Sequence, residues 1–214
     1  MFELTDKRLL ALIWVLENKD KSWSILELQK NSGSLGYGPL YNFVKELEKN
    51  GFVSMDSKTH EYRISKAIDV IRFISLARPF RSLESIPYYS SLDFTGMLNM
   101  INGAKLPYAF TVFAASELYH SYVKTDQVHA YIQEGDEKKW EKYLLSKNCL
   151  KAEKNQANIF LIPTKQQVFF TKPEKIKGFS IVPTPVLLSD LFSFGGLAEE
   201  QANFLLEEWL NDRL

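Results

Sequence analysis

Among the hydrogen-bonding and cationic side chains between residues 37 and 63, eight have the types and places that could contact a nucleic acid: Tyr37, Tyr41, Asn42, Lys45, Lys49, Lys58, His60 and Arg63. An Asn amide can bond an adenine edge in two places, a Tyr hydroxyl can reach a phosphate, and a Lys ammonium can do either. The last three could straddle a neighbouring phosphate strand or a minor groove. We interpret the eight as a DNA-contacting set. The alternative is that they are ordinary solvated positions, which the nearby acids Glu46 and Glu48 favour.

The remaining reactive side chains form no familiar catalytic pattern. The chain has three histidines and one cysteine, far apart in the sequence: His60, His120, His129 and Cys149. No pair of them has the spacing of a zinc site, and neither a phosphate-binding P-loop nor a Gly-x-Ser-x-Gly motif is present. Glu134 and Asp136 follow a predicted strand and could in principle hold Mg²⁺, although turns after strands often have this composition. We therefore expect no catalysis, no metal and no cofactor, and interpret His120 and His129 as packing or surface residues.

A short helix must come before the DNA-contacting set. Ser24 and Glu27 have the spacing of a capping box, in which the Ser hydroxyl accepts a hydrogen bond from the amide three residues on. Trp23 and Leu28, on either side of that cap, can form a hydrophobic staple. These signals predict a helix over residues 25–31.

A second helix and a hairpin are predicted to carry the eight side chains. Gly38 at the cap and Pro39 in the first turn predict the helix start, and Gly51 predicts its end after residue 50. The inner face of this helix is apolar and consists of Leu40, Phe43, Val44 and Leu47. Residues 52–53 and 61–64 read as paired strands around a polar tip at 56–59. With an earlier helix over residues 5–18, this order predicts a winged helix-turn-helix. In such a domain the helix after the turn, here the one that ends after residue 50, enters a DNA major groove.

Charge limits this interpretation. The 214 residues carry 26 basic and 26 acidic side chains, and residues 1–66 hold 10 Lys and Arg against 9 Asp and Glu. Because phosphate neutralisation supplies most non-specific affinity, a single copy is expected to bind DNA weakly, and a homodimer is predicted. The lone Cys149, the lack of an apolar run of about 18 residues and the lack of a signal-peptide start predict a cytoplasmic protein with no membrane partner.

The chain is predicted to be α+β. Residues 1–65 form the winged helix, residues 66–82 a connecting helix that either mediates dimerisation or packs within its own chain, and residues 83–214 a larger mixed domain. Strands are predicted in that domain at 108–113, 128–132, 158–162, 168–171 and 179–182. Helices are predicted at 114–122, 136–146, 185–194 and 198–210.

The second half also resembles a known family. Residues 108–111 (Tyr-Ala-Phe-Thr), 114–120, 128–132 and 182–191, with a winged helix in front, are similar to the AbiEi family of antitoxin-type transcriptional regulators from type IV toxin–antitoxin systems. The resemblance implies an operator-binding repressor, a C-terminal domain related in fold to minimal nucleotidyltransferases, and a cognate toxin as a further partner. The chain lacks the Gly-Ser turn that precedes the metal-binding carboxylates of active nucleotidyltransferases, which argues against transferase activity at Glu134 and Asp136.

Taken together, the sequence predicts a DNA-binding transcriptional regulator that acts as a dimer on double-stranded DNA. The two recognition helices are expected to contact half-sites about one helical turn apart. Two alternatives from other classes remain open at this point: a nucleotidyltransferase-type enzyme that uses the C-terminal domain, and a winged-helix module that binds another protein.

Overall fold

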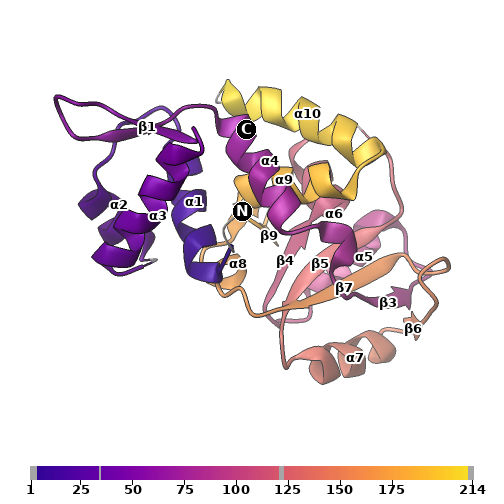
Figure 1. Cartoon of the computed structure of the whole chain (residues 1–214). Helices are drawn as coiled ribbons and strands as arrows, with labels where there is room; N and C mark the ends of the chain where they lie inside the picture. Colours follow the sequence, from indigo (N-terminus) through magenta and orange to yellow (C-terminus); the bar gives the residue numbers. More distant parts are fainter. Residues whose placement is uncertain (1–3, 34, 121–122, 212–214) are drawn as a thin grey trace. The chain divides into compact units, whose positions relative to one another are not determined.

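The computed structural model describes residues 4–33, 35–120 and 123–211. The chain divides into two compact units, Met1–Arg78 and Pro79–Leu214. Helices and a mixed sheet make it an α+β protein, as predicted (Figure 1). No helix among the described residues is both long and apolar enough to cross a bilayer.

The N-terminal unit consists of helices followed by a hairpin and a further helix. In chain order these are α1 (Asp6–Glu17), α2 (Ile25–Ser32), α3 (Tyr37–Lys49), β1 (Val53–Met55), β2 (Tyr62–Ile64) and α4 (Ala67–Ala77). Trp23, just before α2, exchanges two backbone hydrogen bonds of 2.8 Å with Tyr62, and its ring stacks on the Tyr62 ring with a centroid distance of 5.4 Å. This bridge ties the start of α2 to the hairpin.

Local signals place most of these elements correctly. The Ser24 Oγ accepts a hydrogen bond of 3.1 Å from the Glu27 amide, and the Thr5 Oγ1 accepts one of 3.4 Å from the Arg8 amide. Gly51, with φ of 75°, follows Asn50, the C-cap of α3, as its position predicted. The predicted inner face of α3 is fully buried.

The predicted start of α3 is wrong by two residues. Gly36, not Gly38, is the N-cap, because the Leu40 amide donates to the Gly36 carbonyl at 3.0 Å. Pro39 is therefore the third helical residue. It is tolerated there because the amides of the first turn have no acceptor within the helix, so a missing N–H costs nothing.

Helix α4 lies within the N-terminal unit, whereas the sequence places residues 66–82 in a separate connector. It contacts α1, and the Phe73 ring lies 5.3 Å from the Phe52 ring. Its apolar face, which includes Ile71 and Ile74, is buried. The apolar period that suggested a connecting helix thus marks a helix packed in its own unit.

The C-terminal unit contains a sheet that, over the described residues, has seven strands in the order β6-β3-β7-β5-β4-β9-β8. The strands are β3 (Ile86–Tyr89), β4 (Tyr108–Thr111), β5 (Val128–Gln133), β6 (Leu150–Lys151), β7 (Ile159–Thr164), β8 (Glu174–Ile176) and β9 (Phe179–Ile181). The pairs β5–β7 and β4–β9 are parallel and the others are antiparallel.

Helices cover this sheet. They are η1 (Phe80–Ser82), α5 (Phe94–Asn102), α6 (Val112–Tyr119), α7 (Glu137–Ser146), α8 (Val168–Thr171), α9 (Thr184–Phe194) and α10 (Leu197–Leu210). Helix α9 contacts α6 and α10, and Figure 1 shows α9 and α10 on one side of the sheet and α7 on the other. The core therefore lies in two layers around the central strands.

Several predictions for this unit need correction. The segment 168–171 is a helical turn, not a strand: the Thr171 amide donates to the Gln167 carbonyl at 2.9 Å, and the neighbours Val168 and Phe169 are both buried, which breaks strand alternation. Strand β4 ends at Thr111, and α6 begins two residues before the predicted helix, whose residues 121 and 122 lie outside the described part. The predicted elements do not include β3, β6, β8 or α5.

Candidate nucleic-acid interface

Helix α3 presents a polar and aromatic surface opposite its buried side. Tyr37, Tyr41, Asn42 and Lys49 are exposed, while Lys45 is half-buried. The Tyr37 and Tyr41 rings stack with centroids 6.4 Å apart. The helix forms this way because its apolar residues recur at three- and four-residue spacing, which leaves the intervening positions in solvent.

The hairpin carries the other three predicted residues, Lys58, His60 and Arg63, and all of them are exposed. Its tip is organised by Asp56, whose Oδ1 accepts hydrogen bonds from the amides of Lys58 at 2.8 Å and Thr59 at 3.4 Å. These two hydrogen bonds hold the pKa of the Asp56 carboxyl below its usual value, and the bond from Lys58 has the larger effect. The turn closes at His60, with φ of 58°, whose amide donates to the Asp56 carbonyl at 2.8 Å.

Helices α2 and α3 and the hairpin surround a hollow of about 380 Å³. Its lining includes four of the eight predicted residues: Tyr37, Tyr41, Lys45 and His60. The structure therefore brings part of the helix set and part of the hairpin set together around one depression. Asn42, Lys49, Lys58 and Arg63 do not line it.

Lys45 is already paired within the unit. Its Nζ donates to the Glu48 Oε2 at 2.8 Å and lies 5.8 Å from the ring centroid of Tyr41 and 5.5 Å from that of Tyr62. The hydrogen bond to Glu48, followed by that to Tyr62, raises the pKa of Lys45. Its charge is thus balanced locally, whereas Lys49, Lys58 and Arg63 form no ion pair with any described residue.

Sequence reasoning missed two exposed apolar residues of the hollow. Leu26 is 65% exposed and Met55 is 36% exposed, and both line the hollow. A signal was present for both. Leu26 lies on the outer side of α2, and Met55 lies on the same face of its strand as the buried Val53, because residues two apart in a strand share a face. The hollow is consequently more apolar than the predicted set alone suggests.

In the C-terminal unit, the carboxylates considered for a metal have cationic partners. The Asp136 Oδ1 lies 2.6 Å from the Lys139 Nζ, and the Glu134 Oε1 lies 3.4 Å from the Lys165 Nζ. Among the residues the structure describes, no three His, Cys, Asp or Glu side chains gather as metal ligands. The His120 ring lies 5.4 Å from the Phe204 ring.

A polar network is buried behind the sheet of the same unit. The Asp190 Oδ2 accepts hydrogen bonds from the Thr111 Oγ1 at 2.7 Å and from the Tyr131 hydroxyl at 3.0 Å. Asp190 is 1% exposed, so this network ties α9 to β4 and β5 inside the core.

Comparisons with known proteins do not assign the chain to a family. No protein-family model matches it, and no curated protein matches it. Its function is therefore inferred from the residues and geometry described above.

Proposed function

We propose that the protein is a DNA-binding transcriptional regulator without catalytic activity, and that residues 1–65 form a winged helix with α3 as its recognition helix. The observation that carries the proposal is the exposure of all the predicted residues of α3 and the hairpin other than the half-buried Lys45, with both elements meeting at one hollow. A helix whose outer face is polar, flanked by a hairpin with exposed cations, suits a major groove and its adjoining phosphates. The resemblance to AbiEi-type regulators is in line with this proposal.

The geometry suggests separate roles for the contacting residues. Asn42 is the side chain suited to reading an adenine edge, and Lys49 and Arg63 are cations suited to phosphates. Lys58 extends the cationic set at the hairpin tip. Lys45, bonded to Glu48, supports Tyr41 rather than adding net charge.

The proposal includes DNA binding by two copies of the chain, because the surface of one copy carries few unpaired cations. With three cations free of ion pairs on this surface, one copy neutralises few phosphates, and affinity rises when two copies bind together. We therefore propose a cytoplasmic homodimer that represses transcription at its own upstream region, with a toxin as a further partner.

Selection of genomic DNA fragments by the purified 214-residue chain, at one fixed salt concentration, tests the proposal. Enrichment of a palindromic sequence with half-sites about 10 base pairs apart is the expected result. The Asn42→Ala variant should then lose about tenfold in discrimination at one position of each half-site, while Asn155→Ala, an exposed residue of the C-terminal unit, should not. No enrichment over bulk DNA overturns the proposal.

A second candidate function is recognition of another protein by the same surface. The exposed Leu26 and Met55 favour it, because exposed apolar side chains that gather around a hollow often mark protein interfaces. A Leu26→Ser and Met55→Ser double variant that still selects DNA but no longer retains a co-purifying partner supports this function. Loss of DNA selection in that variant instead assigns the apolar residues to DNA, where they can contact thymine methyl groups.

A further inference from the structure

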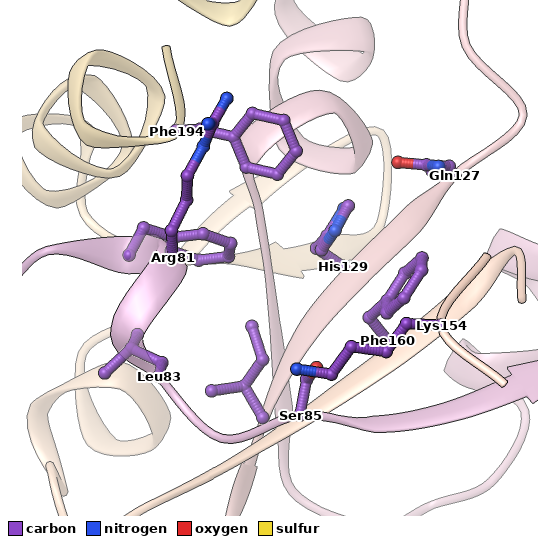
Figure 2. A pocket seen from close by; sticks show the side chains of 10 residues that line it. Arg81, Leu83, Ser85, Gln127, His129, Lys154, Phe160 and Phe194 are labelled. Carbon is purple, nitrogen blue, oxygen red and sulfur yellow. The ribbon is translucent and has the colours of Figure 1, made fainter.

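The C-terminal unit contains a second pocket, of about 180 Å³, on one face of its sheet. Strands β5 and β7 form its floor, and η1 and the end of α9 form a wall. The lining residues are Phe80, Arg81, Leu83, Ser85, Gln127, His129, Lys154, Phe160, Ile162 and Phe194. Figure 2 shows the rings of His129, Phe160 and Phe194 around the same opening.

His129 lies at the centre of an aromatic cluster. Because His129 and Phe160 face each other across the parallel strands β5 and β7, their rings stack with centroids 4.7 Å apart and planes 9° apart. The rings of Phe80 and Phe194 meet His129 edge to face at 5.8 Å and 5.5 Å. These rings form a cage that suits a flat aromatic ligand, which stacks face to face or edge to face on such side chains.

One polar atom in this cage has no partner. His129 is 5% exposed, and its Nδ1 forms no hydrogen bond. The Nδ1 atom is itself enclosed, so His129 contributes its ring, and not this nitrogen, to the pocket.

The polar part of the lining is cationic. Arg81 and Lys154 contribute positive charge, Ser85 and Gln127 contribute neutral hydrogen-bonding groups, and no carboxylate lines the pocket. The Arg81 guanidinium lies 5.5 Å from the Phe194 ring centroid, so its charge is held beside the aromatic cage. A guanidinium can bind a carboxylate through two parallel hydrogen bonds.

Volume restricts the ligand further. A cavity of about 150 Å³ lined by apolar side chains holds one benzene ring, whereas drug-sized ligands occupy about 300–1,000 Å³. The pocket volume of about 180 Å³ therefore fits one ring with a small substituent and excludes a nucleotide.

We propose that this pocket binds a small aromatic carboxylate, with its ring against Phe160 and Phe194 and its carboxylate at Arg81. Lys154 adds positive charge at the rim of the pocket. The site lies wholly within the C-terminal unit and is independent of whether the N-terminal unit binds DNA.

Isothermal titration calorimetry of the 214-residue chain with benzoate tests the proposal. We expect saturable binding of one benzoate per chain, about tenfold weaker binding of benzamide, which lacks the charge, and several-fold weaker binding of cyclohexanecarboxylate, which lacks the aromatic face. Absence of saturation with benzoate, or equal binding of benzamide, overturns the proposal.

Two variants test the assigned residues. Arg81 is exposed, so Arg81→Gln should fold normally and weaken benzoate binding about tenfold, whereas Lys172→Gln, an exposed cation outside the pocket, should leave binding unchanged. His129→Phe keeps an aromatic ring at this position, so it should fold and bind benzoate with similar affinity. Equal benzoate affinity in Arg81→Gln and Lys172→Gln overturns the assignment of the carboxylate to Arg81.

Discussion

The two units of the chain differ in where they place their polar groups. In the N-terminal unit, Lys49, Lys58 and Arg63 lie on the surface of a helix and a hairpin. In the C-terminal unit, Asp190 and His129 are buried among strands and helices that are distant in sequence. A helix and a neighbouring hairpin are enough to form a surface for a large, hydrated partner. A pocket for a small ligand instead requires segments that are distant in the sequence and meet only in the folded unit.

The largest expected effect of a single substitution lies in the buried network of the C-terminal unit. Asp190→Ala removes the acceptor of the Thr111 and Tyr131 hydroxyls and leaves both groups buried. Each buried hydroxyl left without a partner costs about 1–3 kcal/mol, so the free energy of unfolding should fall by about 2–6 kcal/mol. Urea unfolding followed by circular dichroism measures it.

The control for this prediction is Glu153→Ala, at an exposed acid of the same unit, which should change stability by less than about 0.5 kcal/mol. If Asp190→Ala lowers the free energy of unfolding no more than this control does, the two hydroxyls find other acceptors. The buried polar groups of the C-terminal unit would then contribute less to its stability than their hydrogen bonds indicate.

The second largest expected effect is a loss of stability at acidic pH, caused by the buried His129. Burial lowers the pKa of His129 to about 4, whereas an imidazole in an unfolded chain titrates near 6.5. Between these values the unfolded chain binds a proton that the folded protein does not bind, so stability is complete above about pH 6.5 and decreases as the pH falls towards 4. The expected loss is about 3 kcal/mol across this window.

Unfolding midpoints measured from pH 7 to pH 4 check this dependence on pH. His129→Phe should remove most of the slope, because the variant has no group to titrate at this position. His60→Phe changes an exposed residue of the N-terminal unit and should keep the slope. An unchanged slope in His129→Phe would assign the acid sensitivity to other groups.

Local sequence rules were sufficient for much of the N-terminal unit. Ser24 and Gly51 act through hydrogen bonds and backbone angles within a few residues, so their roles could be predicted without the fold. Gly38 misled the prediction because Gly36 could cap the same helix and Pro39 is compatible with either start. Such ambiguity moves a boundary but leaves the element in place.

Local rules were insufficient for the pocket of the C-terminal unit. His129 and Phe160 become neighbours only through the parallel pairing of β5 with β7, and Phe80 meets Phe194 only because α9 contacts η1. Nothing near His129 in the sequence identifies these partners. The same limit explains the segment 168–171, whose residues favour a strand but adopt a helical turn with Val168 and Phe169 both buried.

The DNA-contacting surface offers a prediction of intermediate size. Lys49→Ala and Arg63→Ala together remove two exposed cations that form no ion pair, so DNA affinity should fall by about 2 kcal/mol, or about thirtyfold. The slope of log affinity against log salt should become shallower by about two. Mobility shifts at several salt concentrations measure both quantities.

A double variant of equal charge provides the comparison for the DNA measurements. Lys7→Ala with Lys21→Ala removes two exposed cations of the same unit that belong neither to α3 nor to the hairpin. Equal loss of affinity in the two double variants would show that total charge, rather than the surface of α3 and the hairpin, determines binding.

The smallest expected effect concerns the cap that starts α2. Ser24→Ala removes the hydrogen bond of 3.1 Å to the Glu27 amide and should lower the free energy of unfolding by about 1 kcal/mol, whereas Thr5→Ala removes a longer bond of 3.4 Å and should cost less. Ser24→Asp should restore stability because an Asp carboxylate caps equally well and suits the positive end of the helix. Ser24 also lines the hollow, where a new carboxylate would repel phosphate. Ser24→Asp should therefore have the stability of the wild-type protein but bind DNA more weakly, and wild-type DNA affinity in this variant would mean that the hollow lies outside the DNA interface.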